Sequence, residues 1–592
     1  MKERLSGLRA VIRLCYRTDP RDSRLQLALG ILMALQVPAL SYGGKLALDG
    51  ILGGDAASAY TGAAILSVGV VLLAAIILAY IKVVFRLVGK CTRAGDRELM
   101  DLSTATASID HFEQERYLDD LHRIREDRHY LAMGINWPAQ WIRSLLVVTA
   151  GGLLLATIHP LMVLFPALAV FALYVGGKAN KLQVAAQKAT SPAERLRRAL
   201  FEIGTRSEPA KELRTFGSAR RVGEFHARQG AEVVAERNRA ELKSVLWMSM
   251  EGLLSAAVMA GALAFGLYLA VDGRATAGDL AMLGSLLITV AGTSAQLVGM
   301  TALMARMGVV GRRIERLRGY VAERGAKEGG GPAPETLESG IALRDVSFSY
   351  PGAERPVLSG LDLDLPAGKV VALVGENGAG KTTVAKMLSG FLEPTGGEVL
   401  LDGEPLSEVA KTDWHSRIGA TFQDHAKFEF TAAETVALGD LRDTSEERVR
   451  DAMRRTGTDD LLEDLPDGLD TRLGVRWENG VDLSGGQWQK LAIARGRMRR
   501  APLLVVFDEP TAALDPQTEH RLFERFAEET RHGAHRGTVT VLISHRFSTV
   551  SMADLIVVLD SGRVAEAGTH EELVAAGGQY AELHALQSAS YG

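Results

Sequence analysis

The stretch Val370-Val-Ala-Leu-Val-Gly375-Glu-Asn-Gly-Ala-Gly380-Lys381-Thr382 decides the fold of the second half of this 592-residue chain. Its apolar run predicts a buried strand, and the GxxxxGK[ST] pattern after it predicts a phosphate-binding loop that leads into a helix at 384–390. Glycines leave backbone N–H groups free to surround phosphates, Lys381 would reach the β- and γ-phosphates, and the Thr382 hydroxyl would bind Mg²⁺. The stretch therefore predicts an α/β nucleotide-binding domain.

A second apolar run, Leu503-Leu-Val-Val-Phe507, is followed directly by Asp508 and Glu509. A carboxylate at the end of a buried strand suits a water-rich, octahedral Mg²⁺ site. We therefore predict Asp508 as a metal ligand beside Thr382. The structural alternative for Asp508 is a helix cap.

The segment Leu483-Ser484-Gly485-Gly486-Gln487 lies between these two motifs. It resembles the signature motif of ATP-binding cassette (ABC) transporters, and the resemblance extends over essentially the whole chain. The resemblance implies a multidomain fold, in which an all-α transmembrane domain of six helices precedes an α/β P-loop nucleotide-binding domain.

The resemblance also implies roles for single residues. Glu509 corresponds to the general base, His545 to the switch histidine, and Gln423 to the Q-loop glutamine near Mg²⁺; with Lys381 they form the predicted catalytic set. The predicted metal ligands are Thr382, Gln423 and Asp508. The predicted ATP-binding residues are Tyr350 (stacking on adenine), Gly375, Asn377, Gly378, Ala379, Gly380, Lys381, Thr382, Thr383, Ser484, Gly485, Gly486, Gln487 and the D-loop residue Asp515. Taken alone, Tyr350 could equally be an ordinary aromatic residue in a turn. His545 could equally be a hydrogen-bonded histidine in the core.

The first half of the chain is rich in long apolar runs. Hydrophobic residues make up 47% of the chain, charged residues 23%, and the mean hydropathy is +0.07. This composition excludes a disordered chain, and the mean hydropathy is high for a soluble protein. About six membrane spans are expected, at 25–44, 61–81, two within 135–177 on either side of His159-Pro160, 245–271 and 280–305.

Lysine and arginine set the expected orientation. They crowd 1–24, 82–130 and 178–243, whereas the proposed outer turns carry only Lys45 and Arg274. The positive-inside rule places the dense segments, both termini and the nucleotide-binding domain in the cytoplasm, which predicts a multi-pass protein of the cytoplasmic membrane.

Four regions are expected along the chain: an amphipathic elbow at 1–24, a transmembrane domain at 25–320, a linker at 321–340 and an ABC ATP-binding domain at 341–592. In the elbow, Leu5, Leu8, Ile12 and Cys15 share one helical face, which favours a helix along the inner membrane surface. A solvated basic tail is the alternative. The linker contains the Gly/Pro-rich stretch 329–334, which packs no core.

Two cytoplasmic excursions are charged yet helically periodic, so we expect helical extensions beyond the membrane. Within them, 110–117 and 211–217 each place an aromatic at a bend. These segments are candidate contacts for a cytoplasmic partner domain. Spacing alone allows equally a helix corner that packs inside its own domain.

Charge and cysteine content exclude several partners. A net charge of −4 and a pI near 6.4 argue against a dedicated nucleic-acid binder. Two cysteines cannot build a disulfide framework, a four-cysteine zinc site or a redox CxxC. The expected partners are ATP, Mg²⁺, membrane lipids and a transported substrate. Because the family closes each signature motif over the nucleotide of a second cassette, one cassette and six spans imply a homodimer, or a heterodimer with a related half.

The resemblance implies an exporter of the type IV fold. Such an exporter is an ATP hydrolase whose activity is coupled to transport, that is, a translocase. Import by a protein with this exporter fold remains an alternative. The segments 110–117 and 211–217 and Trp488 resemble exporters of lanthipeptides and lasso peptides, which predicts a peptide natural product as cargo. The alternatives are a multidrug or lipid exporter (flippase) of the same fold, or an ATP-gated channel or regulator.

Polar residues inside the expected spans are candidate cavity liners, because intramembrane polar groups are costly. They are Gln36, Glu251, Thr289, Thr293 and Gln296. For the Thr and Gln residues, a role in joining helices explains the sequence equally well. Glu251 is the strongest candidate, and its charge favours a cationic cargo.

Overall fold

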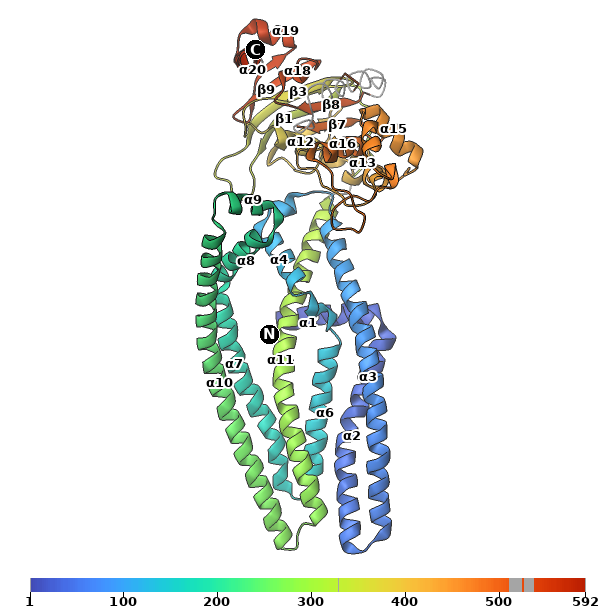
Figure 1. The fold of residues 1–592 in the computed structure, drawn as a ribbon, viewed down its shortest axis with the longest axis vertical. Helices are drawn as coiled ribbons and strands as arrows, with labels where there is room; N and C mark the ends of the chain where they lie inside the picture. The colour runs from blue at the N-terminus through green and yellow to red at the C-terminus, as the bar shows by residue number, and fades with distance from the viewer. Residues whose placement is uncertain (1, 328–329, 510–523, 526–536, 591–592) are drawn as a thin grey trace. The chain divides into compact units, whose positions relative to one another are not determined.

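The computed structural model describes residues 2–327, 330–509, 524–525 and 537–590 (Figure 1). The chain forms two compact units. The first, here called the helical unit, comprises Met1–Asp101 and Asp120–Arg318, and the second, the α/β unit, comprises Leu102–Asp119 and Gly319–Gly592. Unlike the four consecutive regions expected from sequence, the α/β unit includes a short segment from the first half of the chain.

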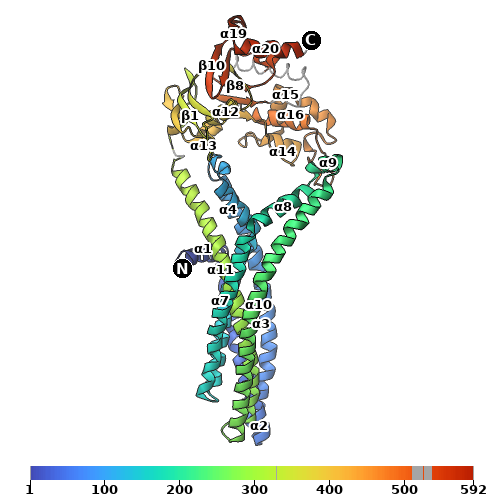
Figure 2. The ribbon, with the colours of Figure 1, turned by 90° about the vertical axis from the view of Figure 1, so that its left-hand side faces the viewer.

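Long helices build the helical unit, and Figure 2 shows α7 and α10 lying side by side. The helices are α1 (Lys2–Thr18), α2 (Pro20–Gly53), α3 (Ala56–Thr104), α4 (Glu115–Glu126), α5 (Arg128–Ala132), α6 (Asn136–Ala156), η2 (Pro160–Val163), α7 (Leu164–Ala189), α8 (Ser191–Thr205), α9 (Ser207–Thr215), α10 (Ala219–Val271) and α11 (Ala277–Lys327).

Among the described residues, five helices are long and apolar enough to cross a membrane: α2, α3, α6, α10 and α11. They coincide with five of the six expected spans. The remaining expected span falls on α7, whose uncharged run ends at Gly177 and whose later residues include Lys178, Lys181 and Lys188. The chain break expected at His159-Pro160 is present, because α6 ends at Ala156 and the His159 ring accepts a hydrogen bond from the Leu161 N–H at 3.2 Å.

The elbow helix α1 packs on its own chain through a face that shares Cys15 with the face expected at the membrane surface. Gly7, Val11 and Cys15 are buried, whereas Leu5 is 47% exposed. A Cβ on Gly7 would lie 2.2 Å from the Gly308 carbonyl oxygen, so the backbone of α11 approaches here too closely for any side chain. The smallest residue of α1, and not its leucines, therefore sets which face packs.

The expected helical extensions are continuous with the membrane helices. The charged end of α11 runs to Lys327, so the first residues of the expected linker are helical. Arg324, in this end, pairs with Asp110 and lies 3.3 Å from Glu393, all within the α/β unit. These ion pairs stabilise the end of the helix. The Gly/Pro-rich stretch 329–334 was expected to pack no core, but its Ala333 is 6% exposed and lies in the hydrophobic core of the α/β unit.

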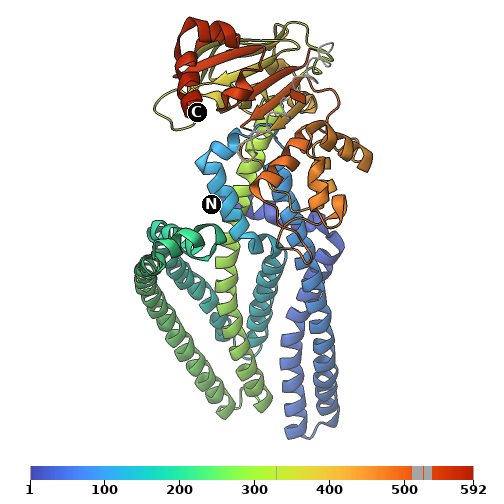
Figure 3. The same cartoon turned by 45° about the horizontal axis from the view of Figure 1, so that its top comes forward.

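Two sheets form the framework of the α/β unit (Figure 3). The six-stranded sheet has the order β10-β9-β3-β8-β7-β6 and is parallel from β9 to β6, and the four-stranded sheet β2-β1-β4-β5 is antiparallel. The strands are β1 (Gly340–Phe348), β2 (Leu358–Pro366), β3 (Val370–Val374), β4 (Gly396–Leu401), β5 (Glu404–Pro405), β6 (Ile418–Thr421), β7 (Leu504–Asp508), β8 (Val539–Ile543), β9 (Leu555–Asp560) and β10 (Arg563–Gly568).

The helices of this unit are short. They are η1 (Asp110–Glu113), α12 (Lys381–Leu388), η3 (Leu406–Glu408), α13 (Lys411–Ser416), α14 (Ala432–Ala437), α15 (Glu446–Thr456), η4 (Asp459–Asp464), η5 (Gly468–Asp470), α16 (Gly485–Gly496), α18 (Phe547–Val550), α19 (His570–Ala576) and α20 (Gln579–Ser590). The expected strand at 370–374 is present as β3, and the expected helix after the phosphate loop begins earlier, at Lys381.

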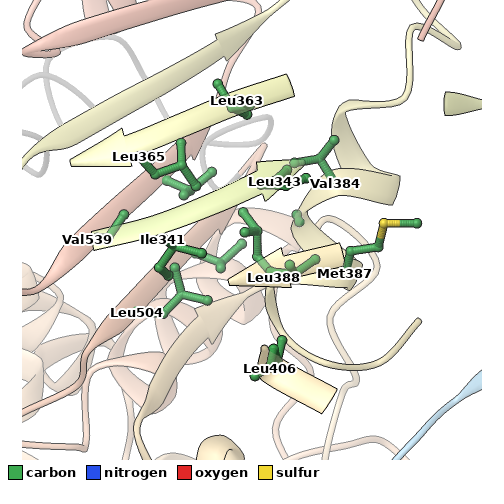
Figure 4. Close-up of a cluster of buried hydrophobic side chains, with 14 of the residues drawn as sticks. Ile341, Leu343, Leu363, Leu365, Val384, Met387, Leu388, Leu406, Leu504 and Val539 are labelled. Carbon is green, nitrogen blue, oxygen red and sulfur yellow. The ribbon is translucent and has the colours of Figure 1, made fainter. Parts of the chain in front are cut away.

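One hydrophobic core holds α12 against both sheets. Figure 4 shows Val384, Met387 and Leu388 of α12 among Leu343 of β1 and Leu504 of β7, and all five are fully buried. Because α12 continues directly from the phosphate loop, this packing fixes the loop. A separate core joins α14, α15 and α16 into a helical layer.

Candidate nucleotide-binding site

The phosphate loop needs glycine at two positions. Gly375 has φ +149°, and a Cβ there would lie 2.2 Å from the Leu559 carbonyl oxygen. Gly380 has φ +100°, and a Cβ there would lie 2.5 Å from a methyl carbon of Leu358. A side chain at either position would meet both left-handed backbone strain and a steric clash. The predicted loop residues Asn377, Gly378 and Ala379 lie in the turn between them, where the Ala379 N–H donates to the Glu376 carbonyl at 3.2 Å.

Lys381 lies inside the loop. Its Nζ donates to the carbonyl oxygens of Gly375 and Glu376 at 2.8 and 2.9 Å. The side chain is buried, and this burial lowers the pKa of its ammonium group below the ordinary value. A partly desolvated cation held by loop carbonyls is well placed to exchange those acceptors for phosphate oxygens.

Asp508 and Thr382 form the predicted metal pair. The Thr382 hydroxyl donates to Asp508 Oδ1 at 3.4 Å, and Asp508 is 1% exposed at the end of β7. Burial raises the pKa of the Asp508 carboxyl. These two oxygen ligands fit Mg²⁺, which takes one or two protein oxygens and completes its shell with water and phosphate. The described residues contain no group of three or more His, Cys, Asp or Glu that could hold a metal by themselves.

Glu509 brings the predicted catalytic residues together. Gln423 Nε2 donates to Glu509 Oε2 at 2.8 Å, and His545 Nε2 lies 2.8 Å from Glu509 Oε1. Gln423 follows β6 and His545 follows β8, so the three side chains meet at the carboxyl edge of the parallel sheet, where α/β proteins bind ligands.

The backbone of Glu509 is held in an unusual conformation. Its φ is +47°, which a non-glycine residue adopts only at a cost. Its N–H donates to the Ile543 carbonyl at 2.9 Å, and its carbonyl accepts a hydrogen bond from Gln489 Nε2 at 3.3 Å. These contacts offset the backbone strain and turn the carboxylate toward Gln423 and His545.

Tyr350 is tied to the phosphate-loop helix. Its hydroxyl forms a hydrogen bond with the Thr383 hydroxyl at 3.3 Å, and its ring lies edge-on to Phe348 with ring centroids 5.0 Å apart. Tyr350 and Thr383 are therefore neighbours. The stacking of Tyr350 on adenine stays a prediction.

The signature residues lie at the start of α16. Ser484 caps this helix in a reciprocal box with Gln487, which leaves Gly485 and Gly486 in the first turn. Trp488, one of the residues behind the predicted peptide cargo, is 3% exposed and packs in the core of the helical layer. The predicted D-loop residue Asp515 lies outside the described residues.

The segment 110–117 contacts the nucleotide-binding machinery of its own chain. The Ser108 hydroxyl and the Ile109 N–H both donate to the Phe391 carbonyl, at 2.9 and 3.3 Å, and Glu113 lies 3.8 Å from Lys386 of α12. Of these contacts only that of Glu113 lies within 110–117, and the segment belongs to the same compact unit as Phe391 and Lys386. A contact with a partner domain stays a prediction. The other candidate, 211–217, presents Phe216 with 75% of its surface exposed.

Sequence reasoning missed Phe391, Gln489 and Gln587, whose contacts hold the site. Phe391 acts through its backbone carbonyl, which no side-chain pattern reveals. Gln489 lies two residues beyond the signature, and Gln587 lies in the C-terminal helix, where it bonds to the backbone on both sides of Arg546.

The chain is similar to known proteins in both sequence and structure. The family model described as ABC transporter matches residues 358–512. The chain is similar to the ATP-dependent lipid A-core flippase of Chromobacterium violaceum, with 37% identity over 342 residues, 57% of this chain and 55% of that protein. It is also similar to the ATP-dependent lipid A-core flippase of Aromatoleum aromaticum, with 35% identity over 63% of this chain and 60% of that protein.

These alignments span little more than half the length of the curated relatives. A solved structure covers far more: a bacterial Atm1-family ABC exporter with ATP bound aligns with 97% of this chain and 98% of its own, with a TM-score of 0.74 and 25% sequence identity. The chain thus has an ABC exporter fold, with membrane-type helices followed by an ABC ATPase domain.

Proposed function

We propose that two copies of this chain form an exporter of the cytoplasmic membrane, which uses ATP binding and hydrolysis to move an amphipathic lipid from the inner side outward. The observation that carries the enzymatic part is the meeting of Gln423, Glu509 and His545 at the sheet edge that also holds Asp508. A carboxylate placed beside a metal ligand and a phosphate loop is the arrangement that in-line attack by water on a γ-phosphate needs.

Each side chain has a task in this reaction. Glu509 takes the proton from the attacking water, and His545 holds the Glu509 carboxylate and reaches the γ-phosphate. Lys381 stabilises the charge that develops on the phosphate oxygens. Mg²⁺, held by Thr382 and Asp508 with Gln423 beside them, would neutralise phosphate charge when bound.

The coupling to transport would run through Phe391. This residue follows α12 by three positions, and its carbonyl receives two hydrogen bonds from Ser108 and Ile109. Those residues follow the end of α3, a helix of 49 residues whose apolar part is long enough to span a membrane. A shift of α12 on nucleotide binding would therefore pull on α3, which offers a route to alternating access.

The position of the signature motif in the fold supports the proposed homodimer. Ser484 begins a helix whose core is separate from the one that holds the phosphate loop. In the ABC resemblance this helix end closes over the ATP of a second cassette, and this chain has one phosphate loop and one signature. A second copy supplies what one copy lacks.

A lipid is proposed as cargo in place of the expected peptide. The relatives described above are lipid A-core flippases, and the peptide reading drew partly on Trp488, which serves as a core residue. Of the candidate cavity liners, Thr289 and Thr293 donate to carbonyls of their own helix, and Gln36 donates to the Gly69 carbonyl at 2.6 Å. Glu251 accepts a hydrogen bond from the Ser255 hydroxyl at 2.9 Å, and Gln296 accepts one from the Ser144 hydroxyl at 3.3 Å. These contacts join residues of the helices and favour no particular cargo, so the lipid is proposed from the relatives.

The test measures ATP hydrolysis by the purified protein in nanodiscs. Addition of a lipid A-core preparation is expected to stimulate the rate severalfold, whereas a panel of modified peptides leaves it unchanged. Stimulation by peptides alone would reject the lipid and restore the peptide prediction. Absence of hydrolysis under every condition would reject the enzymatic proposal as well.

A further inference from the structure

The C-terminal helix α20 is bonded to the loop that carries the switch histidine. Gln587 Nε2 donates to the His545 carbonyl at 2.9 Å, and Gln587 Oε1 accepts from the Phe547 N–H at 3.0 Å. A single side-chain amide thus satisfies a backbone acceptor and a backbone donor two residues apart. Both distances are those of well-formed hydrogen bonds.

The helix that carries Gln587 is itself firmly anchored. Tyr580 is 0% exposed and packs in a core with Ile556 and Val558 of β9. The Phe547 ring lies 5.2 Å from the Tyr580 ring and 5.4 Å from the His584 ring, measured between centroids. Tyr580 also shares a 2.8 Å hydrogen bond with His570. Gln587 therefore projects from a fixed support onto the loop.

The loop needs such support because it is short and lies between two regular elements. β8 ends at Ile543, α18 begins at Phe547, and His545 lies between them. The Ser544 hydroxyl accepts from the Arg546 N–H at 3.0 Å, which shapes the turn locally. The Gln587 amide then holds both sides of Arg546 and so limits the backbone freedom of His545, whose ring lies 2.8 Å from Glu509.

We propose that Gln587 is a positioning residue for the switch histidine: it holds the backbone of residues 545–547 so that His545 keeps its alignment with Glu509. The proposal rests on the ATPase activity proposed above. It assigns to the C-terminal helix a part in hydrolysis that lies outside every nucleotide-binding motif. Gln587 acts through the backbone on either side of Arg546 and so through His545.

The experiment compares Gln587→Leu with wild type in steady-state ATP hydrolysis by the full-length protein. Leucine keeps the volume but removes both hydrogen bonds. A small misplacement of a catalytic group costs on the order of 10- to 100-fold in rate, so kcat is expected to fall about 10-fold. KM for ATP stays within about twofold of wild type, because Tyr350 and the phosphate loop are untouched. Gln579→Leu, on the first turn of the same helix, serves as the matched control and keeps the wild-type kcat.

A double-mutant cycle separates positioning from general structural support. In a His545→Ala background, Gln587→Leu is expected to cause no further loss of kcat, because the residue that it positions is gone. An equal loss in both backgrounds would overturn the proposal, and so would an unchanged kcat in Gln587→Leu alone. If the wild-type protein hydrolysed no ATP, the proposed function would fail; a wild type that hydrolyses ATP beside an unaffected Gln587→Leu would defeat only the present inference.

Discussion

The sheet around the phosphate loop and the helix α10 differ in what surrounds their side chains. In β3, β7 and β8, residues such as Val371, Val505 and Val541 are 0 to 1% exposed. Helix α10 has 53 residues, of which only Val233, Ser244, Gly266 and Leu269 are buried. The α/β unit therefore buries its own apolar surface, whereas α10 leaves large apolar side chains such as Leu246 and Leu253 exposed.

This difference teaches where each unit obtains its stability. A parallel sheet covered on both faces is complete within one chain. A helix of the hydropathy of α10 with an exposed apolar surface requires lipid or a second chain around it. We expect substitutions in the sheet to affect chemistry and folding directly, whereas the effect of substitutions on α10 depends on its surroundings.

Glu509→Gln is expected to have the largest effect. Glutamine keeps the size of the side chain but cannot take a proton from water, so steady-state ATP hydrolysis falls by at least about 100-fold. Binding of ATP, measured with a fluorescent analogue, is retained because the phosphate loop is unchanged. Glu398→Gln, an exposed position on β4, gives a matched control. Normal hydrolysis in Glu509→Gln would remove Glu509 from the role of base.

The next largest effect is expected when a buried leucine is replaced by alanine, in comparison with an exposed one. Leu283 of α11 is 0% exposed, whereas Leu253 of α10 is 73% exposed. Leu283→Ala leaves a cavity and is expected to cost about 2 to 5 kcal/mol of unfolding free energy. Leu253→Ala changes it by less than about 0.5 kcal/mol. Thermal unfolding in detergent checks both, and a Leu253→Ala variant as unstable as Leu283→Ala would show that α10 is buried in the assembled protein.

Asp508→Asn is expected to raise stability while it removes Mg²⁺-dependent hydrolysis. Burial raises the pKa of the folded Asp508 carboxyl above its unfolded value. Its favourable contribution to stability is therefore complete below the unfolded pKa, near ~3.9, and is lost as the pH rises through the folded pKa. Asparagine does not ionise, so without nucleotide the melting temperature at pH 7 rises by about 2 to 4 °C.

The pH dependence of the difference in melting temperature between Asp508→Asn and wild type tests this explanation. The difference between Asp508→Asn and wild type shrinks as the pH falls, because the wild-type carboxyl then becomes neutral as well. Thermal scans between pH 8 and the acid limit of the protein measure it. A gain that grows toward acid pH would mean that Asp508 is stabilised as a carboxylate.

The smallest effect is expected at a helix cap in the helical layer. The Thr431 hydroxyl accepts from the Glu434 N–H at 3.1 Å, and the Glu434 carboxylate accepts from the Thr431 N–H at 3.0 Å. Thr431→Ala removes half of this capping box and is expected to cost about 1 kcal/mol of unfolding free energy. Thr431→Ser keeps a hydroxyl and is expected to retain most of the unfolding free energy that Thr431→Ala loses. Denaturant titration of both variants measures the difference.

Much of the fold and site was predictable because motif chemistry is local in sequence. The glycines of the phosphate loop, Lys381 and Thr382 are adjacent in the chain, and the strands before the two motifs read directly as apolar runs. The long helices were equally visible as apolar runs, since a membrane span requires about 20 such residues.

Contacts made by backbone atoms or by distant side chains could not be predicted. The Phe391 carbonyl, the positive φ of Glu509 and the reach of Gln587 to residue 545 depend on the assembled fold. The packing of α1 on its own chain could not be predicted either, because the close approach at Gly7 depends on α11, about 300 residues later. The cargo was the least predictable, since apolar helix surfaces carry little chemical information.

Lipid movement in sealed proteoliposomes tests the central claim most directly. A fluorescent phosphorylated lipid is placed in both leaflets, and its access to a quencher outside the vesicle is followed after ATP addition. With ATP and Mg²⁺ outside, only molecules whose ATPase domains face outward are active, and those move lipid away from the ATP side. We predict ATP-dependent depletion of the outer leaflet with wild type and none with Glu509→Gln. Equal lipid movement with both proteins, or none with a wild type that hydrolyses ATP, would contradict the account.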